Sequence, residues 1–237
     1  MTSSPEVTAA RDRPVTTALP AALDRPFAGV LFDMDGTLIS SVASVLRSWA
    51  TLAGELDIPR VDFDHFHGVP ARGILDVVLP ERTQAERDAA FERILELELA
   101  DVDGITVLPG AREALAVLAP RGLCAVVTSS TRDLAIRRLG AAGLPVPAAV
   151  VTADDVARGK PDPEPFLAGA ARLGVDPAHC LVVEDAEAGV RAGRAAGATT
   201  VGLTTTTPGL DADLVVADLA ALRFTVDADA RVRVGPA

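Results

Sequence analysis

The chain has 237 residues, of which 49% are hydrophobic, and a formal net charge of −11 from 33 acidic and 22 basic residues. This length allows one core domain with a smaller insertion, or two modest domains, and the apolar fraction excludes a disordered chain. The negative charge argues against a nucleic-acid partner or an acidic membrane surface. It leaves room for a small anionic substrate held by local donors and a cation.

Two further features indicate where the protein works. Cys124 and Cys180 each open an apolar run without metal-ligand spacing, so we expect buried, reduced thiols. No apolar run reaches the length of a membrane span, and the N-terminus lacks the apolar block of a secretory signal. We therefore expect a cytoplasmic protein without a membrane partner.

The first half of the chain contains one predicted strand followed by a helical block. Residues 1–25 are rich in Thr, Ser, Pro and Ala without a clear period, which predicts a disordered tail. The apolar run at residues 28–32 predicts a buried strand. Residues 41–108 carry helical patterns and no strand signal. The helices expected there cover residues 42–56, 74–79 and 84–100, the last with Thr83 as its N-cap.

The second half alternates predicted strands and helices. The strands cover residues 124–128, 149–152, 180–184, 199–203 and 214–216. The helices cover residues 111–118, 132–142, 164–173 and 186–196. Because the strands are continuous apolar runs, both faces of their sheet should be covered. The order predicts an α/β fold with a doubly wound parallel sheet, followed by a small hairpin at residues 224–226 and 232–234.

Polar residues follow four of the predicted strands. Asp33 and Asp35 come directly after the first strand, with Gly36 at the turn that ends it. The other polar positions are Thr128 to Ser130, Lys160, and the pair Glu184 and Asp185. In doubly wound sheets, ligands bind beyond the carboxyl ends of the strands, so these side chains should share one site.

The carboxylates of this set suit a magnesium site. Asp33, Asp185 and the backbone carbonyl near Asp35 offer the hard oxygen ligands that Mg²⁺ prefers, and Glu184 would orient a metal-bound water. In the first pair, one carboxylate could attack a substrate while the other moves a proton. A structural interpretation stays open, in which the first pair only ends a strand and the second pair caps a helix.

The remaining polar residues suit a phosphate group. Lys160 could neutralise carboxylate and phosphate charge, which a transferring phosphoryl group requires. Ser129 and the amides after it, including that of Ser130, could donate to phosphate oxygens at the start of a helix. Taken alone, Lys160 could also be a solvated loop lysine before Pro161.

Four motifs then carry a family resemblance. In chain order they are DMDGT at 33–37, TSS at 128–130, GKPDPEPF at 159–166 and EDAEAGVRAGRAAG at 184–197. They resemble the four motifs of the haloacid dehalogenase superfamily, over residues 29–205. The resemblance implies a Rossmann-like core of residues 26–40 and 109–237, with a mobile helical cap inserted at residues 41–108. It also implies magnesium-dependent phosphoryl transfer through an aspartyl-phosphate.

The same resemblance implies a role for each site residue. The implied roles are nucleophile for Asp33, general acid/base for Asp35, phosphate binding for Ser129 and Lys160, and magnesium binding for Asp185 with support from Glu184. Dehalogenases and phosphonate hydrolases of the superfamily lack an acid two residues after the nucleophile. The acid at position 35 therefore favours a phosphate-ester substrate.

A finer resemblance is to the glycerol-phosphate, 2-deoxyglucose-6-phosphate and related sugar phosphatases. It rests on DGTLISS with Trp49, HG at 67–68, TSSTRD at 128–133 and VTADDVARGKPDPEPFLAG at 151–169. The next residues, VPARG, match neither these phosphatases nor the GVSR of β-phosphoglucomutase, whose arginine would fall at Ala71. By this comparison residues 65–72 face the substrate from the cap. The candidate substrate contacts are His65, His67, Arg72, Ser130 and Arg132.

We therefore expect a cap-gated, Mg²⁺-dependent phosphatase of a small phosphorylated polyol or sugar, working as a monomer or weak homodimer. The alternative is a phosphomutase of the β-phosphoglucomutase type, which needs a second phosphate grip in the cap and slow hydrolysis of its phosphoenzyme. A non-catalytic binding protein on the same fold is the third possibility. Phosphate release without a bisphosphate activator separates the first two, and any magnesium-dependent turnover of p-nitrophenyl phosphate excludes the third.

Overall fold

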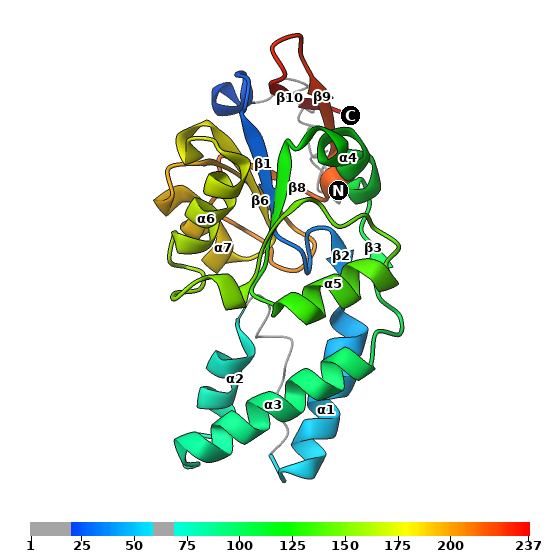
Figure 1. Ribbon diagram of the computed structural model, residues 1–237, viewed down its shortest axis with the longest axis vertical. Coiled ribbons are helices and arrows are strands. Elements are labelled where there is room, and N and C mark those ends of the chain that lie inside the picture. Colours follow the sequence, from blue (N-terminus) through cyan, green and yellow to red (C-terminus); the bar gives the residue numbers. More distant parts are fainter. Residues whose placement is uncertain (1–19, 59–68) are drawn as a thin grey trace, which may run out of the picture.

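A computed structural model of the protein, in which residues 20–58 and 69–237 are described, contains one six-stranded parallel sheet (Figure 1). The strand order is β5-β4-β1-β6-β7-β8, and every neighbouring pair is parallel. The strands are β1 Gly29–Phe32, β4 Cys124–Val127, β5 Ala149–Val151, β6 Cys180–Glu184, β7 Thr199–Leu203 and β8 Leu214–Val216. The predicted doubly wound α/β fold is confirmed.

Strand β1 lies where the direction of the sheet reverses. From β1 the chain moves to β4 and then β5 on one side, and it then crosses back to β6, β7 and β8 on the other side. At such a switch point the loops that leave the two neighbouring strands diverge, and a crevice opens at the carboxyl end of the central strand. The residues directly after β1 therefore occupy the centre of any site on this edge.

Helices and a hairpin cover the two faces of the sheet. Val30 and Phe32 pack on the side of α4 (Ala111–Leu118) and α5 (Arg132–Ala141), whereas Leu31 packs on the side of α6 (Glu164–Leu173) and α7 (Glu187–Ala195). This alternation follows the two-residue period of a strand. The predicted hairpin is confirmed as β9 (Leu222–Val226) and β10 (Val232–Pro236), and its Phe224 ring meets Phe32 edge-on at 5.9 Å.

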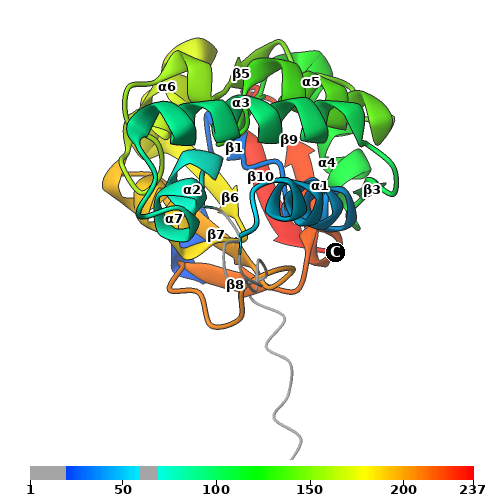
Figure 2. The ribbon, with the colours of Figure 1, turned by 90° about the horizontal axis from the view of Figure 1, so that it is seen from below.

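In the described part of the chain between β2 (Ile39–Ser40) and β3 (Thr106–Val107), three α-helices form a separate cluster at the carboxyl edge of the sheet. They are α1 (Val42–Glu55), α2 (Ala71–Val78) and α3 (Gln84–Ala100), and they lie below the sheet in Figure 1 and cross its end in Figure 2. Their shared core includes Trp49, Leu52 and Ile94. The predicted N-cap residue of α3 is confirmed, because Thr83 and Glu86 form a reciprocal capping box.

Two predictions about segment boundaries were wrong. Thr106–Val107 form strand β3, which pairs antiparallel with β2 (Ile39–Ser40), although residues 41–108 were expected to contain no strand. Residues 20–25 were expected to be a disordered tail, but Leu23 is buried and Arg25 donates to the Ala178 carbonyl oxygen at 2.9 Å. The rest of that segment, residues 1–19, lies outside the described residues.

The two cysteines are buried and free, as predicted. Burial raises the pKa of the Cys124 thiol to about 12 and that of the Cys180 thiol to about 11. Among the described residues, no helix is long and apolar enough to cross a membrane.

Candidate active site

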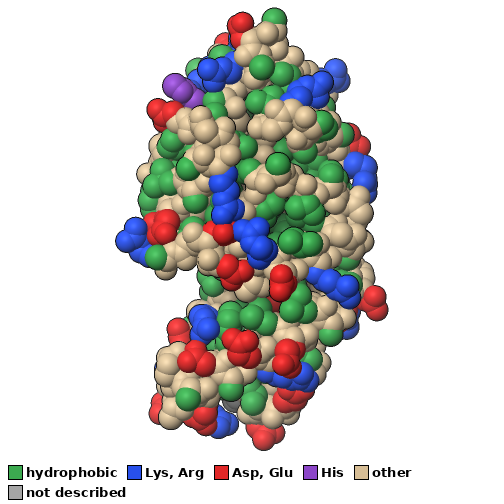
Figure 3. Space-filling model, viewed as in Figure 1, with side chains coloured by type: hydrophobic (Ala, Val, Ile, Leu, Met, Phe, Trp, Pro, Cys, Tyr) green, Lys and Arg blue, Asp and Glu red, His purple; other side chains and the backbone are tan. Residues whose placement is uncertain are grey.

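The loops that leave β1, β4, β5 and β6 bring the polar residues of the sequence motifs to one cavity. The cavity measures about 560 Å³ and lies between the carboxyl edge of the sheet and helices α1 to α3. Figure 3 shows the molecular surface indented between these two parts. The motif residues that line it are Asp33, Asp35, Thr128, Ser129, Ser130, Lys160, Glu184 and Asp185.

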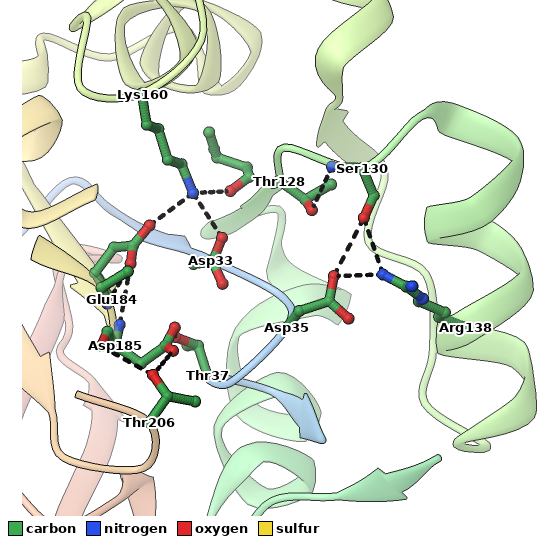
Figure 4. A network of polar contacts seen from close by, with 12 residues as sticks. Asp33, Asp35, Thr37, Thr128, Ser130, Arg138, Lys160, Glu184, Asp185 and Thr206 are labelled. Carbon is green, nitrogen blue, oxygen red and sulfur yellow. Dashed lines mark hydrogen bonds and ion pairs between the residues drawn. The ribbon is translucent and has the colours of Figure 1, made fainter. Parts of the chain in front are cut away.

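Lys160 is the central cation of this site (Figure 4). Its Nζ donates to Asp33 Oδ1 at 2.6 Å, to Glu184 Oε1 at 2.7 Å and to the Val127 carbonyl oxygen at 2.9 Å. Burial alone would lower the pKa of this ammonium group, but the charges of Asp33 and Glu184 outweigh it and raise the pKa. The lysine is therefore charged and held in one position, which excludes the solvated loop lysine.

Three buried carboxylates lie close together at this ammonium group, and two of them, Asp33 and Glu184, contact it. Asp33, Glu184 and Asp185 each offer an oxygen, and these oxygens lie within 4.8 Å of one another. Burial, together with the neighbouring acids, raises the pKa of Asp33 well above its ordinary value, although Lys160 opposes the shift. Burial and the charge of Glu184 likewise raise the pKa of Asp185 to about 7. Excess buried negative charge on hard oxygen atoms fits a divalent cation such as Mg²⁺.

The protein itself orients two of these carboxylates. Glu184 Oε2 accepts the backbone N–H groups of Asp185 and Ala186, both at 3.0 Å, so both of its oxygens are engaged by protein donors. Asp185 accepts from the Thr37 hydroxyl at 3.1 Å and from the Thr206 hydroxyl. Thr37 belongs to the first sequence motif and Thr206 follows β7, and neither was predicted as a site residue.

Two glycines allow the loops to approach this closely. Gly36 has φ +88°, and a Cβ atom there would overlap the Asp185 carboxylate. A Cβ on Gly189, in α7, would overlap the Glu184 carboxylate. Each glycine thus leaves the space that its neighbouring acid occupies.

Asp35 faces a different set of partners from Asp33. Its Oδ1 accepts from Ser41 Oγ at 2.6 Å, and its Oδ2 accepts from Ser130 Oγ at 3.2 Å and Arg138 Nη1 at 3.1 Å (Figure 4). Its carboxylate is outside the group of Asp33, Glu184 and Asp185. This placement is compatible with the sequence prediction, which gives Asp35 a metal-binding role through its backbone carbonyl.

Arg138 is a site residue that the sequence prediction missed. It is buried in α5, contacts Asp35, and forms an ion pair with Glu98 of α3 at 3.4 Å. Burial raises the pKa of Glu98, and Arg138 opposes that shift. A signal existed, because position 138 falls three and four residues after the buried Ala135 and Leu134. A charge on the core-facing stripe of a helix needs a buried partner.

The predicted substrate contacts are not all brought together. Ser130 and Arg72 line the cavity, but Arg72 is engaged by Asp88 at 2.6 Å and stacks over the Phe91 ring. Arg132 lies outside the cavity lining and instead forms two bonds to Asp155, at 2.9 and 2.7 Å. His65 and His67 lie outside the described residues.

The opposite wall of the cavity is largely apolar. It is formed by side chains of α1, α2 and α3, and Glu92 and Glu98 are the acidic members of its described part. The apolar lining residues from these helices are Val42, Val45, Leu46, Trp49, Ala71, Ile74, Phe91 and Leu95. The cavity would thus contact one end of a bound molecule with charged groups of the sheet edge, and the rest of it with a largely apolar wall.

A switch-point aspartate, a buried lysine and a paired acidic motif, which follow β1, β5 and β6, meet at this sheet edge. The family model described as haloacid dehalogenase-like hydrolase matches residues 27–197, and the chain belongs to this family.

Individual relatives place the chain among phosphatases and mutases of the family. Hexitol phosphatase A of Escherichia coli (strain K12) is 42% identical over 171 residues, which cover 71% of this chain and 79% of that protein. Beta-phosphoglucomutase of Bacillus subtilis (strain 168) is 32% identical over 200 residues, covering 79% of this chain and 88% of that protein. The crystal structure of a hydrolase from Pseudomonas syringae superposes with a TM-score of 0.70, at 30% identity, over 81% of this chain and 94% of that one.

Proposed function

We propose that this protein is a Mg²⁺-dependent phosphatase that hydrolyses a small phosphorylated polyol or sugar through an aspartyl-phosphate. The observation that carries the proposal is the buried cluster of Lys160 with Asp33, Glu184 and Asp185 at the switch point of the sheet. Support for the substrate class comes from the likeness to a hexitol phosphatase.

In this proposal Asp33 is the nucleophile. A carboxylate oxygen of Asp33 attacks phosphorus, the ester P–O bond breaks, and the leaving alkoxide takes a proton from Asp35. Water then attacks the phosphorus of the aspartyl-phosphate and gives a proton to Asp35, which frees phosphate and Asp33. Lys160 holds the attacking carboxylate and offsets the phosphoryl charge, while Ser129 and the amide of Ser130 bind phosphate oxygens.

The proposed magnesium ligands are the carboxylates of Asp33 and Asp185 and the backbone carbonyl of Asp35. When bound, the ion would neutralise carboxylate and phosphate charge, so that the two anions can approach each other. Glu184 supports these ligands indirectly, because it binds Lys160 and the backbone amide of Asp185.

We further propose that residues 41–108 act as a cap over the core formed by residues 26–40 and 109–237. The cavity of about 560 Å³ has the size of a small-molecule site. Its apolar wall from α1 to α3 would exclude water while the phosphoenzyme forms and would contact the leaving group. Arg72 on this wall is the proposed specificity contact.

The test is a screen of phosphorylated polyols and hexoses for phosphate release. We expect steady, magnesium-dependent release from at least one polyol or sugar phosphate without a bisphosphate activator, and loss of release in EDTA. Absence of release from every such ester would overturn the proposal.

The mutase alternative is supported by the 32% identity to a beta-phosphoglucomutase. Its test is conversion of β-glucose 1-phosphate to glucose 6-phosphate in the presence of a hexose bisphosphate. We expect hydrolysis to exceed this isomerisation, and faster isomerisation would favour the mutase.

A further inference from the structure

We propose, resting on the phosphatase function above, that Arg138 is a positioning residue that fixes the carboxylate of Asp35, with Glu98 of α3 as its anchor. The buried guanidinium of Arg138 contacts the proposed acid/base Asp35 on the β1 loop (Figure 4). It also contacts Glu98, an acid on a helix of the opposite wall.

Three donors fix the Asp35 carboxylate. Ser41 binds Oδ1, whereas Ser130 and Arg138 both bind Oδ2. An ionised carboxylate has about four lone-pair positions, so these donors leave one, on Oδ1, for a proton in transit. Rotation of the carboxylate would break the charge-assisted bond to Arg138. The guanidinium therefore selects which oxygen of Asp35 serves the substrate.

The burial and the contacts of Arg138 suit this positioning role. The side chain is buried, and its Nη1 donates to both Asp35 and the Ser130 hydroxyl, the latter at 3.2 Å. Its Nη2 pairs with Glu98 Oε2, while its buried Nε has no hydrogen-bond partner among the described residues. A buried arginine is destabilising unless it is paired, and here both charge partners are side chains at the cavity.

The neighbouring Arg137 also joins α5 to α3, but it does so away from the site. Its Nε donates to the Leu99 carbonyl oxygen at 3.3 Å in an exposed contact that does not involve Asp35. Glu98, in contrast, is buried and is also hydrogen-bonded by the Trp49 side chain of α1. The anchoring of Asp35 through Arg138 thus continues into two helices of the opposite wall.

The experiment compares two leaving groups. An alkoxide needs a proton from Asp35, whereas p-nitrophenolate leaves without one, and kcat/KM reports only the formation of the phosphoenzyme. For Arg138→Met we expect kcat/KM to fall by about 30-fold for the best alkyl phosphate and by less than about 3-fold for p-nitrophenyl phosphate. Arg138→Lys should recover part of the alkyl phosphate rate, because an ammonium group can still donate to Asp35.

The matched control is Arg137→Met, which removes an α5–α3 contact without touching Asp35 and should change both rates by less than about 2-fold. If Arg138→Met does not fold, Glu98→Gln retains the shape of the anchor and should give a smaller loss of about 5-fold that is again selective for the alkyl phosphate. Equal losses on both substrates, or the same selectivity from Arg137→Met, would overturn the role of Arg138. If the wild-type protein hydrolyses neither substrate, the proposed function fails as well.

Discussion

Asp33 and Asp35 are only two residues apart, but their carboxylates contact different groups. Asp33 contacts Lys160 within the buried acidic cluster, whereas Asp35 is bound by two hydroxyl groups and a guanidinium. Residues two apart in a strand share one face, but β1 ends at Phe32 and the chain turns after Met34, so the two carboxylates reach different partners. Surroundings that differ in this way allow one carboxylate to attack and the other to transfer protons.

The assignment of Asp33 predicts the effect of a conservative change. Asp33→Asn keeps the shape of the side chain and can still accept from Lys160, but an amide is a poor nucleophile. We expect phosphate release to fall by about 10⁴-fold or more, with an unchanged far-UV circular dichroism spectrum. Residual activity within tenfold of the wild-type value would show that Asp33 is not the attacking group.

The acidic cluster predicts how stability depends on pH without metal. The pKa of Asp185 is raised from an ordinary value of 3.8 to about 7, and that of Asp33 is raised as well. The folded protein thus binds protons that the unfolded chain has released, so this contribution is complete below about pH 4 and is lost as pH rises through about 7. Between pH 5 and 8 we expect the free energy of unfolding in EDTA to fall by a few kcal/mol.

The measurement is urea unfolding at pH 5 and pH 8, with and without Mg²⁺. Magnesium should stabilise the protein more at pH 8, where three ionised carboxylates otherwise have only the Lys160 ammonium group to offset their charge. Asp185→Asn should flatten the dependence measured in EDTA. Stability in EDTA that rises over this range would contradict the raised pKa values.

Among single residues, the sequence identified those that come soon after the end of a strand, because the strand end fixes where they lie. Asp33, Lys160 and Asp185 were expected together because parallel strands bring their carboxyl ends to one edge, and they lie there. Arg138 was missed because its partners come from distant segments. Arg132 was assigned to the substrate because of its place after the β4 loop, but the bond to Asp155 holds it elsewhere.

Among the elements, the turn that follows β1 is the one whose backbone most directly builds the site. Gly36 combines a positive φ with a contact to Asp185 that leaves no room for Cβ. Thr205 also donates to the Gly36 carbonyl oxygen, so the β7 loop holds the same turn. The metal ligands proposed here, Asp33, Asp35 and Asp185, therefore depend on one glycine that contributes no side chain.

We predict that Gly36→Ala displaces Asp185 and lowers magnesium-dependent turnover by about 100-fold, because small displacements of reacting groups have effects of this size. The matched control is Gly122→Ala, at φ +65° with no heavy atom within 4 Å of the added Cβ. That variant should lose about 1–2 kcal/mol of stability and keep its activity. Similar activity losses in both variants would show that backbone strain alone, and not displacement of Asp185, lowers the activity of Gly36→Ala.

The longer elements were predictable because their apolar periods extend over several residues. The bounds of α3, α4, α6, β6 and β7 agree with the predicted ranges. Strands β2 and β3 have two residues each, too few to show a period, and their pairing depends on contacts between segments far apart in sequence. Helix α2 begins at Ala71, three residues before the predicted start, directly after Pro70.

The whole molecule places a charged sheet edge opposite an apolar helical wall. The two parts are joined through β2 and β3, where the chain leaves and re-enters the core. Apart from the contact of Arg138 with Glu98, chemistry at the edge and selection at the wall can therefore be changed separately, which is the arrangement expected if residues 41–108 act as a cap.

This separation predicts the effect of changing Arg72 on the wall. Arg72→Ala should alter kcat/KM among sugar and polyol phosphates by about tenfold relative to p-nitrophenyl phosphate, since the small aryl ester needs few contacts with the wall. The comparison variant is Asp88→Asn, which removes the ion pair of Arg72 but keeps the arginine. Equal losses on all substrates after Arg72→Ala would place Arg72 outside substrate selection.

The most direct test of the account is to observe the phosphoryl group on the enzyme. Acid quenching during turnover of the best substrate, followed by mass spectrometry of the peptides, should show a phosphorylated peptide that contains Asp33. Asp35→Asn should increase its amount during turnover of p-nitrophenyl phosphate, because release of phosphate then becomes slow, and Asp33→Asn should abolish it. Turnover without any phosphorylated peptide, or phosphorylation at another residue, would contradict the account.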